Sequence, residues 1–309
     1  MSISLEKVEY GGWKNCLKLS GDGVELVVTL DVGPRVIRLG VPGGQNLFKE
    51  FDEQMGKTSG SEWLSFGGHR FWHAPEVFPR TYAPDFEPVE YTWKDNVLYL
   101  KQKTEPETGI QKEFEISIQD KAVHLTHRLI NHNVWAVELA PWCLSVMAAG
   151  GRALIPQAEF IPHPDVLTPA RPMVLWHFTR MNDPRFTWGD RLIQMREDSQ
   201  FDSKQKFGIR NTQGWAAYEL GTDLFIKSVP LITGATYPDM GCSFEFFTMP
   251  GMLEVESLGP LVKLEPNAAI EHVEEWWVIP NVHLPKDEAP LIEALNPHLE
   301  KLGLQTIKI

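Results

Sequence analysis

The sequence predicts an all-β fold, a large antiparallel β-sandwich with short helices near the C-terminus. Short runs rich in β-branched and aromatic residues recur at intervals of about ten residues, with turn residues between them. In residues 111–118 polar and apolar side chains alternate, which is typical of an antiparallel strand with one exposed face. No regular alternation of strands and helices interrupts the runs, and this disfavours a doubly wound parallel sheet.

The predicted strands span most of the chain and leave two other segments. The strands are residues 24–30, 35–40, 97–103, 111–118, 122–130, 215–220, 224–229, 243–248 and 273–279. Residues 156–184 are rich in Pro, His and Asp and predict a long surface loop of the kind that borders a site. Residues 287–301 predict two short helical pieces, because Pro297 would break a continuous helix. We expect one domain over residues 1–309, with a helical extension at about 285–303.

Composition disfavours two classes of partner. The chain has 309 residues, 43% of them hydrophobic and 23% charged, as in ordinary globular proteins. A formal net charge of −12 disfavours binding to nucleic acid or to an anionic membrane surface. The three cysteines are far apart and show no metal-type pairing, which favours a reducing compartment. With neither a signal peptide nor a long apolar stretch in the sequence, we expect a cytoplasmic protein.

Glu254 and Glu256 are two residues apart in the run EVESLGPL. In a strand this spacing places both carboxylates on one face, where they repel each other unless the face is exposed to water, paired or used in catalysis. A Glu-x-Glu pair by itself is more often an exposed strand face. Eleven tryptophans accompany it, more than average usage predicts, and Trp rings pack in cores but also stack on sugar rings.

The segment FGGHRFWHAPE, residues 66–76, concentrates chemically active side chains. Its Gly-Gly pair permits a tight backbone path, and it offers two imidazoles, a guanidinium, an indole and a carboxylate from His69, Arg70, Trp72, His73 and Glu76. The spacing of the two histidines would suit a metal on a helix, but the glycines before them and the proline after them argue against a helix. We therefore expect no metal.

Two later segments complete the candidate site. Pro238, Asp239 and Gly241 predict a turn that leads into the strand at 243–248, and Asp239 is most simply a turn residue. The run that contains Glu256 is followed by a polar turn at 265–267 and by the strand within 269–279. We expect these two strands to pair as a hairpin or to be near neighbours.

The order of these segments resembles the galactose mutarotase-like superfamily of sugar-binding β-sandwich proteins. Residues 67–72 resemble the GG…W segment of its hexose-phosphate branch, and VESLGPL resembles the segment of the aldose branch that holds the catalytic glutamate. LEPNAAIEHVEEWWV resembles the closing turn and strand. An uncharacterised bacterial branch is more similar, with motifs such as GG-x-R-x-W-x-A-P, DPR, GW-x-A-Y, YPD and E-x-E-x-LGP. The resemblance covers about residues 24–279.

The resemblance implies roles for particular residues. Glu256 takes the position of the general base, with Glu254 beside it, Arg70 binds substrate and Trp72 forms a wall of the pocket. A mutarotase also needs a general acid for the ring oxygen. The aldose branch has a histidine there, in a segment resembling VELAPWCLSVM, whereas this chain has Trp142. His69 or His73 is the expected substitute, and the other candidates for the acid are His132, His163 and His177. Glu76, Trp142 and Asp239 complete the expected substrate-binding set.

Three functions remain open from the sequence. The first is an aldose 1-epimerase-like isomerase that acts on a small carbohydrate by general acid/base catalysis, without a cofactor. The second is a carbohydrate-binding protein that has lost the acid. The third is a carbohydrate-cleaving enzyme, which would require a carboxylate such as Glu76 or Asp239 across a cleft from Glu256. The sugar, its phosphorylation and any self-association are not predicted.

Overall fold

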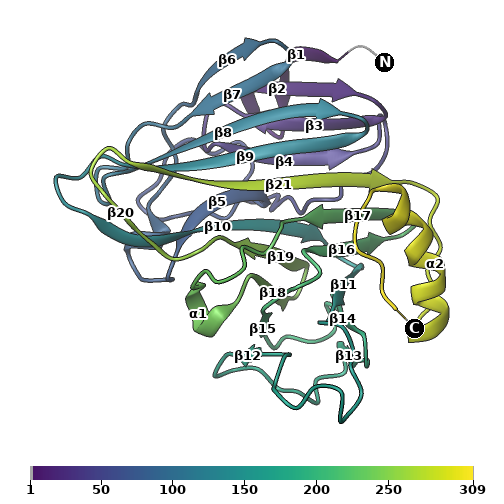
Figure 1. Ribbon diagram of the computed structural model, residues 1–309. Helices are drawn as coiled ribbons and strands as arrows, with labels where there is room; N and C mark the ends of the chain where they lie inside the picture. The colour runs from purple at the N-terminus through teal and green to yellow at the C-terminus, as the bar shows by residue number, and fades with distance from the viewer. Residues whose placement is uncertain (1–2, 309) are drawn as a thin grey trace.

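The computed structural model describes residues 3–308, which form two large antiparallel sheets packed face to face (Figure 1). The first sheet has the order β1-β2-β3-β4-β5-β10-β19-β18-β15-β12, and β20 pairs with β10. The second has the order β13-β14-β11-β16-β17-β21-β9-β8-β7-β6. The predicted antiparallel β-sandwich is therefore confirmed.

The two sheets contain 21 strands within residues 3–308. The strands of the first sheet are β1 (Ser4–Tyr10), β2 (Trp13–Gly21), β3 (Val24–Thr29), β4 (Arg35–Gly40), β5 (Gly68–Ala74), β10 (Val137–Ala148), β12 (Met173–Leu175), β15 (Gln205–Ile209), β18 (Phe244–Met249), β19 (Met252–Leu258) and β20 (Val262–Leu264). Those of the second sheet are β6 (Glu90–Lys94), β7 (Val97–Lys101), β8 (Ile110–Gln119), β9 (Ala122–Asn131), β11 (Arg152–Pro156), β13 (Phe186–Trp188), β14 (Leu192–Arg196), β16 (Trp215–Leu220), β17 (Asp223–Ser228) and β21 (Ala269–Ile279). Every strand predicted from the sequence is present.

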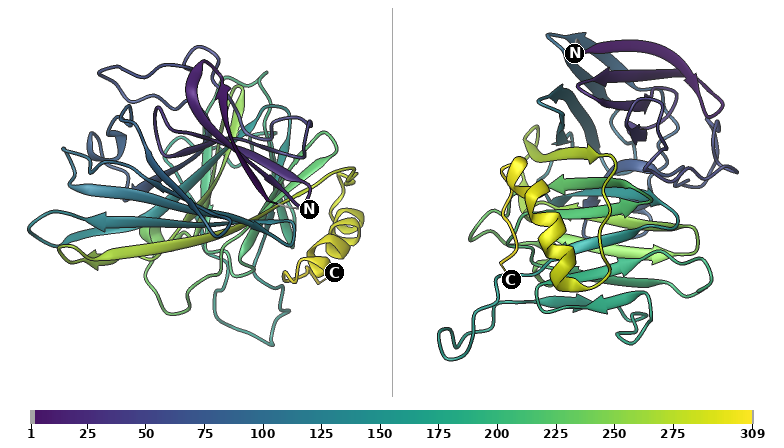
Figure 2. Two further views of the ribbon diagram at one scale, coloured as in Figure 1. Left: turned by 90° about the horizontal axis from the view of Figure 1, so that it is seen from above. Right: turned by 90° about the vertical axis from the view of Figure 1, so that its right-hand side faces the viewer.

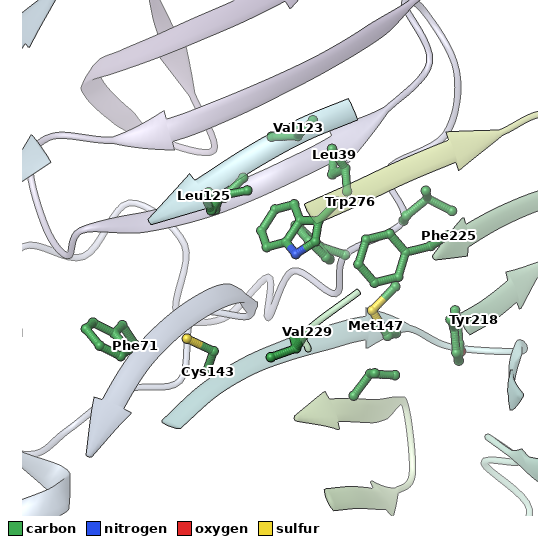
Figure 3. Packing of buried hydrophobic residues seen from close by; sticks show 14 of the residues in the cluster. Leu39, Phe71, Val123, Leu125, Cys143, Met147, Tyr218, Phe225, Val229 and Trp276 are labelled. Atoms are coloured by element: carbon green, nitrogen blue, oxygen red, sulfur yellow. The ribbon is translucent and has the colours of Figure 1, made fainter. Parts of the chain in front are cut away.

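The core lies between the two sheets. Phe48, Phe225 and Trp276 contact one another edge to face, with ring centroids 5.7 to 6.0 Å apart. Figure 3 shows Phe225 and Trp276 in this core. Met147 of the first sheet and Leu125 of the second belong to the same buried cluster. Each fully buried side chain of this size contributes about 1.5–3 kcal/mol by leaving water, so this layer of contacts holds the two sheets together.

The helical part is one continuous helix, so the expectation of two pieces is wrong. Helix α2 (Glu288–Lys301) contains Pro297 in its interior. Burial of Leu291, Ile292, Leu295 and Leu299 compensates for the hydrogen bond that proline cannot donate. These residues pack with Trp215 and Ile226 on the outer face of the second sheet, where Figure 2 shows the helix at the side of the sandwich. Within residues 3–308 no helix combines the length and apolarity needed to span a membrane.

The expected pairing of the Glu254 strand with the last strand is also wrong. Strand β19 pairs with β10 and β18 in the first sheet, whereas β21 pairs with β9 and β17 in the second. The chain between them forms β20 and crosses from one layer to the other. The two strands therefore face each other across the core and do not form a hairpin.

Two glycines set the start of β5. Gly67 and Gly68 have φ values of 95° and 69°, a region that other residues rarely adopt. A Cβ on Gly67 would lie 1.9 Å from the carbonyl oxygen of Lys49, and one on Gly68 would lie 2.4 Å from that of Val36. Only glycine fits this close approach of backbones. It brings residues 69–74 into the first sheet as a strand, and these residues do not form a helix.

Candidate functional site

A cavity of about 500 Å³ lies against the face of the first sheet that is turned away from the core. Its floor comes from the centre of that sheet, and its walls come from the loops that follow β4, β5 and β12. The long loop predicted from the sequence supplies Trp176 and Phe178, so this loop borders the cavity. The lining residues include Trp63, Arg70, Trp72, Glu76, Tyr82, Trp142, Leu144, Lys206, Phe247 and Glu254.

The register of the strands aligns the charged residues on this face. Arg70 is opposite Leu144, Leu144 is opposite Glu256, and Glu256 is opposite Glu245 in the neighbouring strand. Like charges directly opposite each other on adjacent strands destabilise a sheet. The arrangement therefore needs a cation close to the two glutamates, and the sequence alone did not predict which residue supplies it.

Lys206 is that cation. Its Nζ lies 2.8 Å from Glu245 and 3.1 Å from Glu256, and all three side chains are buried. The same ammonium group lies over the rings of Trp142 and Trp176, at 4.9 and 4.7 Å from their centroids. Trp142 Nε1 donates a hydrogen bond at 2.8 Å to Glu256 Oε2, the same oxygen that Lys206 contacts. Lys206 thus joins the buried carboxylates to the cavity, which it lines.

One lysine cannot fully compensate two buried carboxylates. Burial raises the pKa of Glu256, and neighbouring Glu254 raises it further, against the opposing effect of Lys206. Burial and the charge of Glu256 raise the pKa of Glu245 well above its usual value. Burial lowers the pKa of Lys206, but the two carboxylates outweigh it, so the lysine pKa is raised and the side chain stays charged. The cluster therefore favours the protonated form of these two acids more than an exposed glutamate would.

The second charged pair opens onto the cavity. Arg70 Nη2 donates to Glu254 Oε1 at 2.9 Å, and both residues line the cavity wall. The guanidinium lies 4.4 Å from the ring centroid of Trp72 and 5.2 Å from that of Trp63. Its Nε and Nη1 have no hydrogen-bond partner, because the aromatic rings enclose them. Glu254, in contrast with Glu256, presents its carboxylate to the cavity.

Aromatic rings form most of the remaining wall. Trp63 contacts Trp72 with centroids 4.9 Å apart, and Trp72 contacts Trp142 at 5.3 Å. Tyr82 contacts both Trp63 and Trp72, at 5.5 and 5.1 Å, and its hydroxyl donates to Glu76 Oε1. Such walls bind apolar faces of a ligand while the few polar groups fix its orientation.

The structure does not bring His69 or His73 to this cavity. Side chains alternate along β5, so both histidines are on the opposite face from Arg70 and Trp72. His69 lies between the sheets, where its Nδ1 is 2.9 Å from Ser145 Oγ and its Nε2 is 2.9 Å from His127 Nε2. His73 is buried on the same face, with neither ring nitrogen hydrogen-bonded.

The interior histidines form a network whose tautomers can be assigned. His127 Nδ1 donates to the carbonyl oxygen of His272, so its Nε2 accepts from His69 Nε2. His69 Nδ1 then accepts from Ser145. Ser257 donates to Glu274, and His272 Nε2 donates to Ser257. Each of these three imidazole rings can therefore be neutral and still have its hydrogen bonds satisfied.

Some of these interior groups also have the spacing of metal ligands. The ligand atoms of His69, His127 and Cys143 lie within 4.8 Å of one another, as do those of Cys143, His272 and Glu274. The histidines and Glu274 already have hydrogen-bond partners there, so the network needs no ion to satisfy them.

The other expected residues lie away from the cavity floor. Asp239 is in α1 (Pro238–Gly241), a single turn in which it has a φ of 50°, so its assignment as a turn residue is confirmed. His132, His163 and His177 are exposed and do not line the cavity. Glu256, Trp142, Glu254, Arg70, Trp72 and Glu76 do cluster at or beneath the cavity.

Sequence reasoning missed Lys206 and Glu245, which complete the charged cluster. A signal was present, because Lys206 and Glu245 are each the one charged residue in a strand of otherwise uncharged residues. It also missed Trp63 and Tyr82, which lie in an irregular segment and in the 3-10 helix η1 (Arg80–Tyr82). No periodic pattern identifies side chains of that kind.

Comparison with known proteins identifies the fold. No protein-family model matches the sequence, and no curated protein is significantly similar to it. A provisionally assigned aldose 1-epimerase from Klebsiella pneumoniae is similar in structure, with a TM-score of 0.58 and 12% identity over 96% of this chain and 87% of that one. A galactose mutarotase-like protein from Lactobacillus casei has a TM-score of 0.54 and 10% identity over 86% of this chain and 100% of that one.

A third similar structure is a larger protein. A TPR-domain containing protein from Parabacteroides distasonis has a TM-score of 0.57 and 13% identity over 95% of this chain. This chain spans 55% of its length. Identities at this level show the fold alone. The chain has the galactose mutarotase-like fold, as its motifs predicted.

Proposed function

We propose that this protein binds a small carbohydrate in the aromatic cavity and catalyses exchange at its anomeric carbon, as an aldose 1-epimerase does. The observation that carries the proposal is the meeting of Glu254, Arg70 and Lys206 in one cavity walled by tryptophans. Aromatic rings bind the C–H faces of a sugar, and the charged groups bind its hydroxyls. The fold of the provisionally assigned epimerase from Klebsiella pneumoniae supports the same reaction class.

The proposed chemistry uses one residue of the cavity wall as the general base and another as the hydrogen-bond and proton donor. Glu254 takes the proton of the anomeric hydroxyl as the C1–O5 bond breaks, and the electron pair of that bond moves to the ring oxygen. Lys206 donates a hydrogen bond to the ring oxygen and stabilises the negative charge that develops there, then supplies its proton. Reclosure on the other face of the carbonyl returns both protons, so the protein is unchanged.

Glu256 has a supporting part in this scheme. It is 0% exposed and is covered by Trp142 and Lys206, so it reaches a ligand only through the lysine. Its carboxylate keeps Lys206 charged and in place. The resemblance instead implies that Glu256 is the base. The variant Glu256→Gln distinguishes the two assignments. It retains sugar binding in either case, but it loses nearly all turnover only if Glu256 is the base.

Anomeric exchange measured by two-dimensional NMR tests the proposal. The panel contains glucose, galactose, mannose and xylose with the 6-phosphates of the hexoses. We expect the wild type to accelerate exchange of at least one sugar, and Lys206→Met to lower the rate by about 100-fold or more. Lys263→Met, which changes an exposed lysine of β20 outside the cavity, should leave the rate unchanged. Wild-type protein without effect on every sugar would contradict the catalytic part.

A specific observation favours a second candidate, binding without turnover. The resemblance places Trp142 at the position of the aldose-branch acid, and Arg70 and Lys206 are already paired with carboxylates. This candidate predicts saturable chemical-shift changes of a sugar with no acceleration of exchange. Nothing comparable favours cleavage, since the cavity is lined by Glu76 but by neither Asp239 nor Glu256.

A further inference from the structure

We propose that the natural ligand is an oligosaccharide, whose reducing-end unit occupies the cavity while the rest of the chain extends over Tyr82 and Phe78. The inference rests on the proposed function, since it names the substrate class of the same site. Its starting point is Phe78, a large apolar side chain that is 81% exposed beside the cavity wall.

Phe78 continues the aromatic wall outward. Its ring centroid lies 5.9 Å from that of Tyr82, with the planes tilted by 45°. Tyr82 in turn contacts Trp63 and Trp72, which line the cavity. The contacts make one series of rings from the cavity to the surface, and most of the Phe78 ring is left uncovered. A series of this kind offers stacking surfaces to successive sugar units.

The segment that carries Phe78 is held in place. The Val77 backbone N–H donates to Thr81 Oγ1 at 2.9 Å, and the Thr81 N–H donates back to the Val77 carbonyl at 2.9 Å. The Tyr82 N–H donates to the Pro79 carbonyl, also at 2.9 Å. Because the turn is ordered before any ligand arrives, stacking on Phe78 costs little conformational entropy.

The polar group beside the rings indicates the chemistry of the ligand. Glu76 is exposed next to Phe78, lines the cavity and accepts a hydrogen bond from the Tyr82 hydroxyl. A hydrocarbon ligand on these rings would take water from the carboxylate without replacing its hydrogen bonds. An anionic ligand would be repelled by it. A neutral chain of hydroxyl groups and C–H faces satisfies both the carboxylate and the rings.

The proposed reaction fixes the direction of the chain. Exchange requires a free anomeric carbon, so the reducing-end unit must reach Glu254 and Lys206. The following units then leave toward the surface, and the half-buried ring of Tyr82 and the exposed ring of Phe78 offer an aromatic path in that direction.

Saturation-transfer NMR with free sugars in solution tests the inference. The probes are glucose, galactose, mannose and xylose, together with their disaccharides and trisaccharides, including the maltose and cellobiose series. We expect a trisaccharide to bind at least about tenfold more tightly than its own monosaccharide. Phe78→Ala should weaken trisaccharide binding by about three- to tenfold and leave monosaccharide binding unchanged. Trp135→Ala, which changes another exposed aromatic outside the cavity, should change neither.

The outcomes separate this inference from the proposed function. Monosaccharides that bind and exchange, with trisaccharides no tighter, would overturn the oligosaccharide inference alone. Equal losses for monosaccharide and trisaccharide in Phe78→Ala, or no loss, would overturn it too. Trisaccharides that bind more tightly through Phe78 without accelerated exchange would support it and contradict only the catalytic part. If no sugar binds, both fail.

Discussion

Two buried charge clusters lie on opposite faces of the same strand, β19, and the pKa values of their glutamates are shifted in opposite directions. Lys227 and Glu274 form an ion pair of 3.1 Å between the sheets, and both are fully buried. Lys206 contacts Glu245 and Glu256 on the cavity side. The interior pair has one carboxylate for one ammonium, whereas the cavity cluster has two carboxylates for one. The residue types are the same, but the ratio of charges differs.

The pKa directions follow from that ratio. Burial raises the pKa of Glu274, but the charge of Lys227 opposes it, and the pKa is lowered. Trp276 Nε1 and Ser257 also donate to this carboxylate. On the cavity side burial prevails, and the pKa values of Glu245 and Glu256 are raised. A satisfied ion pair is suited to holding two sheets together, and an under-compensated one is suited to proton exchange.

The largest expected effect is on stability. Lys227→Met should lower the free energy of unfolding by about 3–5 kcal/mol, because it leaves the Glu274 charge buried without its partner. Lys206→Met should cost less, about 1–2 kcal/mol, because the raised pKa values of Glu245 and Glu256 make it easier for these acids to take up a proton when the lysine is removed, and the site borders the cavity. Urea denaturation measured by fluorescence compares the two. Equal losses would show that the clusters do not differ as described.

Opposite pH dependence sharpens the comparison. The pKa of Glu245 is raised well above 4.5 in the folded protein, so its ionisation costs stability as the pH rises from about 4.5 through the folded pKa. The pKa of Glu274 is lowered from 4.5, so its contribution is present above about 4.5 and is lost as the pH falls through the folded pKa.

The matching variants are Glu245→Gln and Glu274→Gln. Relative to wild type, Glu245→Gln should gain stability as the pH rises from about 4 to 8, and Glu274→Gln should lose most at neutral pH and less in acid. Denaturation at several pH values measures both. Parallel pH profiles for the two variants would refute the difference in protonation.

The smallest effect concerns the two indole donors. Trp142→Phe removes the hydrogen bond to Glu256, and Trp276→Phe removes the one to Glu274. We expect a loss of about 1 kcal/mol for Trp142→Phe and a larger loss, up to about 3 kcal/mol, for Trp276→Phe, since the pKa of Glu274 is lowered and that of Glu256 is raised. Thermal unfolding checks the order, and the reverse order would count against the assignment of charge.

Most of the fold was predictable because strand signals are local. The alternation in residues 111–118 matches β8, whose apolar residues are buried and whose acidic residues are partly exposed. The charged clusters were not predictable, because they depend on register across five strands. Glu254 and Glu256 do share one face, but only the neighbouring strands show that Glu254 opens to the cavity and that Lys206 and Trp142 cover Glu256. Likewise, the spacing of His69 and His73 could not show that β5 turns both toward the core.

Glu254→Gln gives the most direct test of the central claim, that acid/base chemistry takes place in the aromatic cavity. The measurement is the anomeric exchange rate by NMR, at saturating concentration of a sugar that the wild type binds, with Glu265→Gln as an exposed control outside the cavity. We predict that Glu254→Gln still binds the sugar but loses exchange by about 100-fold or more, while the control keeps the wild-type rate. Undiminished exchange in Glu254→Gln would contradict the account.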